Sequence, residues 1–208
     1  MLAEHDALAD SVRGFFARQR IKASLSDDER LEMLRTMLLS RALDAHLKHA
    51  FDRKEIKWRD YPSPQKGFRA LGQEAIVGAA LRLRRGAAFG SGTDYRGDVL
   101  GPLIRDLPAL LMFQPDPLPV ILTQYGKAGT AVGGRDLHVG DFDHGVLPPA
   151  APLAISTQTL VGIAFAMAQR SEDMSYFSRT SSGSFSMRTN MVGTIWVCVT
   201  RCFGTNSR

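Results

Sequence analysis

Apolar residues recur every three or four positions from residue 26 to about residue 56, as they do along one face of an α-helix. Ser26 and Glu29 begin this stretch with the S-x-x-E spacing of a capping box, in which each side chain accepts a hydrogen bond from the other residue's backbone N–H. The pattern predicts a long amphipathic helix that packs one face against a core or a neighbouring subunit. Its apolar positions are Leu31, Leu34, Leu38, Leu39, Leu43, Leu47 and Phe51.

Two shorter helical segments are expected in the middle of the chain, where glycine and proline interrupt the pattern. The first begins at about Gln73 and ends at Gly86. The second lies around Pro102 and is broken again near Pro108, because proline lacks the N–H that a helix interior needs. A connector rich in glycine and proline then runs to about Pro152.

The last helical segment begins at Ser156 and Thr157, which are typical capping residues, and continues as an almost wholly apolar stretch. A helix that is apolar on every side is expected to be buried. Its N-terminus, with unpaired backbone N–H groups, is suited to an anion or a polar ligand.

Composition places the chain among globular proteins, with 208 residues, 44% hydrophobic and 23% charged. The longest apolar run, 161–168, falls far short of the roughly 20 residues that cross a bilayer, so no membrane association is expected. Glu4, Asp6 and Asp10 precede the first basic residues, which argues against a secretory signal or transit peptide. The expected compartment is therefore the cytoplasm.

The basic charge is concentrated in the last 35 residues. Residues 1–173 hold 22 of the 26 Lys and Arg and all 21 acidic residues, whereas residues 174–208 hold four Arg and no acid. No block of basic residues with interleaved aromatics occurs in the body of the chain, which argues against a nucleic-acid partner. A nucleic-acid binder that uses the basic tail remains a distant alternative.

The stretch TDYRGD, residues 93–98, shows neither a strand nor a helix period and carries a tyrosine beside an arginine. A guanidinium on such a loop offers five fixed donors suited to phosphate or carboxylate, and the neighbouring aromatic ring can add a flat wall. The alternative is that Arg96 pairs with Asp94, Asp98 or solvent. Tyr95 has the alternative role of packing.

Five stretches in this order resemble the alpha subunit of thiamine-diphosphate-dependent 2-oxo acid dehydrogenases, the first component of the pyruvate and branched-chain complexes. They are MLLSRALDAHL, GFRALGQEAIVGAALRLRRG, TDYRGD, GGRDLHVGDFDHGVLP and APLAISTQTLVGIAFAMA, and the resemblance covers roughly residues 30–173. It implies an α/β thiamine-diphosphate-binding fold with a parallel sheet flanked by helices. Short apolar stretches such as PVILTQ (119–124) support that fold.

The resemblance also implies a reaction and partners. The reaction is oxidative decarboxylation of a 2-oxo acid with acyl transfer to a lipoyl group, and its cofactor is thiamine diphosphate with Mg²⁺. The partners are a beta subunit, which carries the activating glutamate in this family, and a lipoyl-bearing acyltransferase. The expected divisions of the chain are an N-terminal segment (1–25), the alpha-subunit part (26–173) and an atypical tail (174–208).

The cofactor-binding residues implied by the resemblance are spread along the chain. Arg96 is expected on the diphosphate, with Tyr95 beside it, and Phe68 falls where the family has an aromatic near the cofactor, although a core role is the alternative. His138 matches a family histidine and is expected to be a satisfied loop residue without a catalytic role. The family's cofactor-contacting segment aligns with Ala151, Leu153 and Ser156, whereas Thr157 and Gln158 come two residues late for its cation site.

The metal-binding motif of the family, Gly-Asp/Glu-Gly followed by an asparagine, does not occur in the sequence. Residues 174–208 instead contain 12 Ser and Thr and both cysteines, Cys198 and Cys202, which are expected to be incidental free thiols. A frameshift near residue 174 explains this change best, and a natural tail is the alternative. The chain as written is expected to be inactive, with Leu160, Ile163 and Met167 left exposed. A noncatalytic pseudoenzyme or assembly chain is therefore the alternative function.

Overall fold

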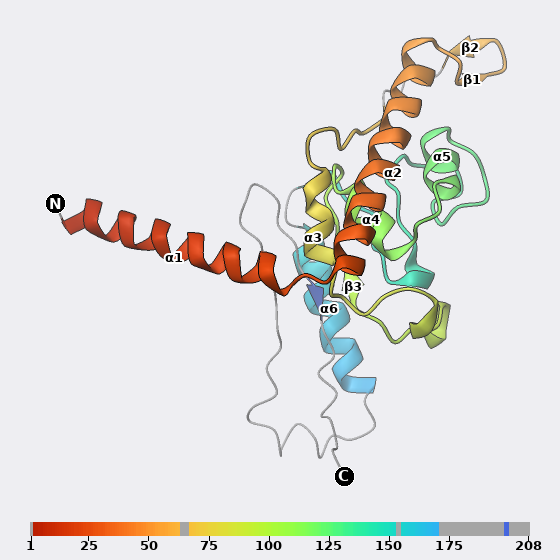
Figure 1. Cartoon of the computed structure of the whole chain (residues 1–208). Helices are drawn as coiled ribbons and strands as arrows, with labels where there is room; N and C mark the ends of the chain where they lie inside the picture. The colour runs from red at the N-terminus through yellow and green to blue at the C-terminus, as the bar shows by residue number, and fades with distance from the viewer. Residues whose placement is uncertain (1, 63–66, 153–154, 171–197, 200–208) are drawn as a thin grey trace. The chain divides into compact units, whose positions relative to one another are not determined.

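The computed structural model describes residues 2–62, 67–152, 155–170 and 198–199. Two compact units divide the chain, Met1–Arg35 and Thr36–Arg208. The first contains helix α1 (Leu2–Ser24) and the beginning of helix α2 (Asp27–Asp52), which continues into the second unit (Figure 1). Within the described part of the chain, no helix is both long and apolar enough to cross a membrane.

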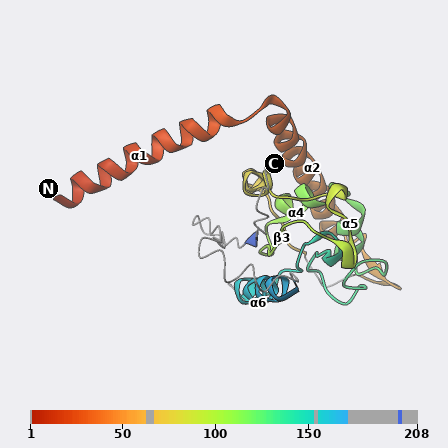
Figure 2. The same cartoon turned by 90° about the horizontal axis from the view of Figure 1, so that it is seen from below.

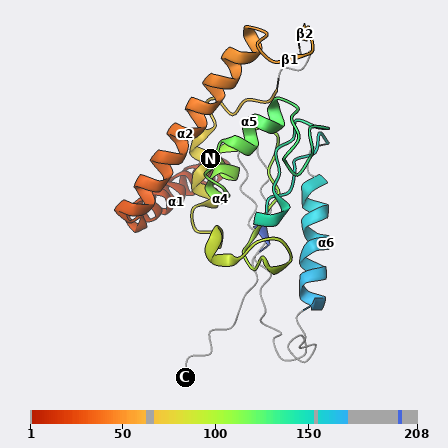
Figure 3. The same cartoon turned by 90° about the vertical axis from the view of Figure 1, so that its right-hand side faces the viewer.

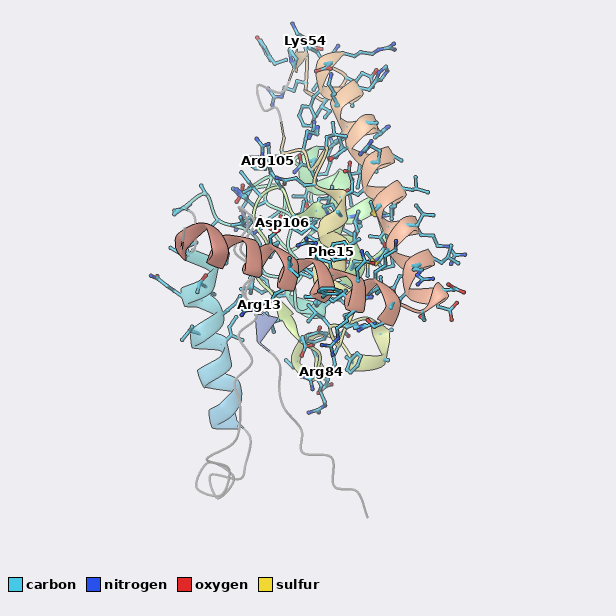
Figure 4. All side chains as sticks on the ribbon, turned by 60° about the vertical axis from the view of Figure 1, so that its left-hand side comes forward. Arg13, Phe15, Lys54, Arg84, Arg105 and Asp106 are labelled. Atoms are coloured by element: carbon cyan, nitrogen blue, oxygen red, sulfur yellow. The ribbon has the colours of Figure 1, made fainter. Side chains whose placement is uncertain are left out.

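Helix α1 is a helix that the sequence pattern did not predict. Most of its residues from 11 onwards are exposed, and they include Phe15 and Phe16, whose rings meet edge to face with centroids 5.7 Å apart. Arg13 and Phe15 are labelled along this helix in Figure 4. Val12, Phe15 and Phe16 have helical spacing but are exposed, so this helix buries no apolar stripe from residue 11 onwards.

The capping box at the start of α2 is confirmed. The Glu29 backbone N–H donates to Ser26 Oγ at 3.1 Å, and the Ser26 backbone N–H donates to Glu29 Oε2 at 2.9 Å. The predicted apolar stripe is divided, because Leu43 and Leu47 are buried while Leu31, Leu34 and Leu38 are exposed. Of the predicted apolar positions, those that pack into the core therefore lie in the second half of α2, at Leu43 and Leu47.

The core of the second unit is built by short helices. These are the 3₁₀ turn η1 (Glu74–Ile76) with α3 (Val77–Ala80), then α4 (Leu107–Phe113) and α5 (Leu118–Gln124). Helix α3 packs against α4, and the side chains from Ala109 to Phe113 are almost completely buried. Arg41 on α2 donates to the buried Glu74 and holds the pKa of that carboxyl at about 2, which ties α2 to η1.

Three expectations about this region are wrong. The helix predicted from Gln73 to Gly86 is limited to the 3₁₀ turn and the single turn of α3. Pro108 does not break a helix but lies in the first turn of α4. Proline is tolerated there because the backbone N–H groups of a first turn have no partner within the helix. The stretch PVILTQ, expected to support an α/β sheet, lies in α5 and is helical, with Val120 and Gln124 buried on one face.

Strands are few and short. Strand β1 (Lys57–Trp58) pairs antiparallel with β2 (Tyr61–Pro62), and β3 (Val99–Leu100) pairs antiparallel with β4 (Cys198–Val199). Leu100 also forms a parallel bridge to Val146, in which its N–H donates to the Gly145 carbonyl at 2.8 Å and its carbonyl accepts from the Leu147 N–H at 2.9 Å. This bridge is the only parallel pairing among the described residues, which contain no parallel sheet. Cys202 and the rest of the tail predicted from residue 174 onwards, apart from β4, lie outside those residues.

Helix α6 (Ile155–Arg170) begins where the sequence predicted, and lies on the opposite side of the second unit from α2 (Figures 2 and 3). Leu160 is completely buried in a cluster with Val99 and Leu147, and Ile163 packs against it. The expectation that Leu160 would be left exposed is therefore wrong. The expectation that α6 is buried on every side is wrong as well, since Val161 is 54% exposed. The side chain of Met167 lies outside the described residues, so its exposure stays a prediction.

The remaining loops contain three 3₁₀ turns, η2 (Ala87–Phe89), η3 (Gly92–Asp94) and η4 (Phe142–His144). Turns η3 and η4 lie against each other, although 47 residues or more separate them in the chain. The TDYRGD stretch runs from η3 into β3, so the pairing of Leu100 with residues 145–147 fixes the end of that stretch.

Candidate functional site

A buried ion pair anchors the loop that carries Tyr95 and Arg96. Asp98 is only 2% exposed and accepts from Arg84 Nε at 3.0 Å, from Arg84 Nη2 at 2.6 Å and from the Arg84 backbone N–H at 2.9 Å. The partner of Asp98 is therefore Arg84 and not Arg96. In Figure 4, Arg84 lies at the opposite end of the second unit from Lys54.

Tyr95 fills the space between two glycines. Its hydroxyl donates to the Asp98 carbonyl at 2.8 Å, and its Cζ atom lies 2.5 Å from the position of a Cβ at Gly97 and 2.7 Å from one at Gly145. Neither glycine can be replaced without moving the ring. The structure thus gives Tyr95 the packing role that the sequence left as an alternative, and a contact with a cofactor remains a prediction.

Of the two neighbours Tyr95 and Arg96, Arg96 is the exposed residue. Its backbone N–H donates to the Phe89 carbonyl at 2.8 Å, which fixes the main chain, while among the described residues none forms a hydrogen bond or ion pair with its guanidinium. On the facing turn, His144 Nδ1 lies 2.7 Å from the Asp141 carboxylate, so that acid already has a partner. Arg96 is therefore available for an anion from outside the described chain.

The start of α6 lies beside the same strand. Ser156 is 9% exposed, and a Cβ on Gly101 would lie 3.1 Å from the Ser156 Cβ and 2.6 Å from Leu160 Cδ1. The helix start is thus packed directly onto the backbone that follows β3. Ala151 is exposed on the preceding turn, and Leu153 lies outside the described residues, so the roles of all three towards a cofactor remain predictions.

Phe68 and His138 form a second cluster. Their rings are stacked, with centroids 5.1 Å apart and planes at 25°, and His138 Nδ1 lies 2.7 Å from both carboxylate oxygens of Asp136. Burial pushes the pKa of Asp136 up, but the hydrogen bonds from His138 and from the Leu137 N–H outweigh it and hold that pKa below its usual value. His138 is therefore held in place by a hydrogen bond at Nδ1 and by a stacked ring.

These two rings belong to the wall of a pocket of about 400 Å³, its open mouth included. The pocket is mostly apolar, with Leu107, Leu110 and Val120 among its lining residues, and its polar wall residues are Asp106, Gln124 and His138. Of the predicted cofactor residues that the structure describes, only Phe68 lines it. The structure therefore does not bring the described members of the predicted set together in this pocket.

Asp106 and Gln124 had no signal in the sequence. Asp106 precedes α4 and Gln124 ends α5, so the two residues and His138 come from three segments 14 to 18 positions apart. Asp106 is 1% exposed, and burial raises its pKa from 3.8 to about 6, even though a hydrogen bond from the Leu103 N–H opposes that shift. Figure 4 shows Asp106 inside the second unit, between the levels of Lys54 and Arg84.

The raised pKa of Asp106 predicts a pH-dependent effect of one substitution. A carboxyl whose folded pKa lies above its unfolded value stabilises the fold below the unfolded pKa, and this contribution is lost as the pH rises through the folded pKa. The substitution Asp106→Asn removes this pH-dependent contribution. The free energy of unfolding of the variant minus that of the unchanged chain is therefore expected to be about 2 kcal/mol higher at pH 7 than at pH 4. Urea unfolding at both pH values measures this difference. Asp116→Asn, at an exposed carboxylate, is the control, and an equal difference at both pH values for Asp106→Asn would contradict the prediction.

Comparison with known proteins gives one curated relative. The chain is 29% identical over 166 residues to the 2-oxoisovalerate dehydrogenase subunit alpha of Bacillus subtilis, and this match covers 77% of the chain and 44% of that protein. The chain thus matches less than half the length of its relative. No family model and no solved structure matches the chain. The relationship is carried by sequence alone, and it confirms the resemblance: the chain is a distant homologue of a 2-oxo acid dehydrogenase alpha subunit.

Proposed function

We propose that the chain acts as the alpha subunit of a thiamine-diphosphate-dependent 2-oxo acid dehydrogenase, together with a beta subunit and a lipoyl-bearing acyltransferase. The observation that carries this proposal is the exposed guanidinium of Arg96 on a loop held by Tyr95 and by the Arg84–Asp98 pair. A guanidinium on a fixed loop suits a diphosphate, because it can give bidentate hydrogen bonds to phosphate oxygens. The distant relationship to a branched-chain alpha subunit supports the same activity.

The described residues fit the anionic end of the cofactor better than its metal. Arg96 would hold the diphosphate, and the N-terminus of α6 beside Gly101 offers further N–H donors. No group of three or more His, Cys, Asp or Glu suited to a metal ion occurs within the described ranges. When bound, the cofactor supplies the nucleophile and the electron sink for decarboxylation, while this chain binds and orients it.

Arg96→Gln tests the proposal directly. Because the substitution removes charge-assisted bonds to the diphosphate, the concentration of thiamine diphosphate for half-maximal binding is expected to rise about 10–100-fold. Calorimetry of the chain mixed with a beta subunit and Mg²⁺ measures that change, and 2-oxo acid turnover in the same mixture measures its consequence. Arg53→Gln, at another exposed arginine, is expected to leave both values unchanged. Equal cofactor binding by the Arg96 and Arg53 variants would contradict the assigned role.

A noncatalytic assembly chain is the second candidate. It is favoured by the sequence of residues 174–208, which holds no acidic residue to serve as a magnesium ligand. Under this alternative the chain forms a stable complex with the beta subunit, yet the mixture turns over no 2-oxo acid at saturating thiamine diphosphate and Mg²⁺. Sedimentation and turnover measured on one sample therefore separate the two functions.

A further inference from the structure

Helix α1 carries an apolar face that the rest of the described chain leaves open. Val12, Phe15 and Phe16 are large apolar residues that are 47–61% exposed. Because an α-helix turns about 100° per residue, these three residues lie on one face, and Leu8 belongs to the same face by its spacing. Large apolar side chains gathered on one exposed face indicate a surface that binds another molecule.

The charges of α1 are divided between its two halves. Residues 2–10 contain three acidic residues and no lysine or arginine, whereas residues 11–24 contain four basic residues and no acid. The acidic residues are Glu4, Asp6 and Asp10, and the basic residues are Arg13, Arg18, Arg20 and Lys22. The helix dipole favours this order only in the first and last turns, so it does not account for the charges near the middle, at Asp10 and Arg13.

This division of charge indicates what covers the apolar face. An acidic groove or an anionic membrane would attract the second half of α1 but repel the first half, and a cationic partner would do the reverse. A second copy of α1 in antiparallel orientation instead places each acidic half against a basic half. A parallel copy would place like charges together, and the charges that flank an apolar seam set the orientation of paired helices.

We propose that α1 pairs in antiparallel orientation with α1 of a second copy of the chain, with Val12 at the centre of the contact. The helix has 23 residues and is about 34 Å long, which is enough for roughly three heptads of contact. The facing pairs are Glu4 with Arg20, Asp6 with Arg18, Leu8 with Phe16, and Val12 with Val12 of the other copy. This pairing does not depend on the proposed enzymatic function, because it uses none of the residues expected to bind the cofactor.

Sedimentation of the full chain without a beta subunit tests the apolar contact. A reversible equilibrium between monomer and dimer is expected at micromolar concentrations. Phe16→Ser is expected to raise the dissociation constant of the dimer about tenfold or more, because it removes an aromatic ring from the contact. Ile21→Ser is the matched control, since Ile21 is 62% exposed and Phe16 is 61% exposed, but Ile21 lies about 180° around the helix from Val12. This control is expected to leave the dissociation constant unchanged.

An exchange of charges tests the electrostatic complementarity at low ionic strength. The double substitution Arg18→Glu with Arg20→Glu is expected to raise the dissociation constant about tenfold or more, because it makes the facing pairs repulsive. A second chain with Glu4→Lys and Asp6→Lys is expected to self-associate as weakly. A mixture of the two chains is expected to form a dimer about as stable as that of the unchanged chain, since every facing pair is attractive again.

Disulfide cross-linking tests the orientation, in a chain whose Cys198 and Cys202 are replaced by serine. In the antiparallel dimer, position 5 of one copy faces position 19 of the other. A mixture of His5→Cys and Gln19→Cys chains is therefore expected to cross-link at least about tenfold faster than either chain alone. In a parallel dimer, each variant would cross-link with itself.

Several results would overturn the proposal. They are a chain that stays monomeric throughout the micromolar range, equal dissociation constants for Phe16→Ser and Ile21→Ser, no recovery of the dimer in the charge mixture, and single cysteine variants that cross-link as fast as their mixture. A monomeric chain that binds phosphatidylglycerol vesicles, and loses this binding with Phe16→Ser, would assign the apolar face to a membrane surface and overturn the proposal as well.

Discussion

Replacing Arg84 with methionine is expected to lower the free energy of unfolding by about 3–5 kcal/mol, because it leaves the buried Asp98 carboxylate without a charged partner. Two of the three hydrogen bonds that Arg84 gives to Asp98 come from the guanidinium, and methionine retains only the one from its backbone N–H. The carboxylate cannot reach water without opening the loop that carries Tyr95 and Arg96.

Urea unfolding of Arg84→Met measures this loss, with Arg53→Met as a control at an exposed site. The double substitution Arg84→Met with Asp98→Asn separates the two parts of the effect. If the loss comes from an uncompensated charge, the double variant recovers much of the stability, because the amide is neutral. A loss below about 1 kcal/mol for Arg84→Met would place the pair among surface ion pairs and contradict its burial.

Gly145→Ala is the substitution with the next largest expected effect, a loss of about 2–4 kcal/mol in free energy of unfolding. Gly145 has φ +76°, a conformation that costs an alanine about 1–2 kcal/mol. The new Cβ would also lie 2.7 Å from Tyr95 Cζ, so the ring must leave its place between the two glycines. The loss is measured by thermal or urea unfolding.

A double-substitution cycle distinguishes these two causes. In a Tyr95→Ala background the collision is absent, so the cost of Gly145→Ala is expected to fall to the conformational part of about 1–2 kcal/mol. Gly133→Ala is the matched control, since Gly133 also has a positive φ of 58° but nothing described lies within 4 Å of the place that its Cβ would take. Equal costs at positions 145 and 133 would show that the Tyr95 ring does not fix the loop.

The parts of the fold that sequence predicted correctly are those set by neighbouring residues. The capping box depends on Ser26 and Glu29 alone, and is therefore readable from a short spacing. The start of α6 was predicted to within one residue, although Ser156 and Thr157 lie inside the helix. The errors concern stretches whose state depends on distant contacts. An apolar run as short as PVILTQ suits a strand or a buried helix equally, and burial of Val120 and Gln124 on one face decides for the helix.

The same distinction between local and distant contacts applies to the candidate site. The TDYRGD stretch drew attention to Arg96 because an arginine in a loop is visible in sequence, and its exposure agrees with an anion-binding role. The alternative in which Arg96 pairs with Asp98 is wrong, because the partner of Asp98 is Arg84, which lies 14 positions earlier and is connected to it by no local rule. Asp106 and Gln124 were missed for the same reason, since they line one pocket with His138 although 14 to 18 positions separate the three residues in the chain.

The parallel bridge of Leu100 to Val146 has a consequence for the order in which the chain folds. The capping box and the helix that follows it involve only local contacts and can form at once, whereas the bridge must first close a long loop, which is slow. Gly145, which accepts from Leu100 and confines Tyr95, belongs to that late step. During synthesis, the loop that presents Arg96 therefore acquires its final shape only after residues 145–147 have left the ribosome.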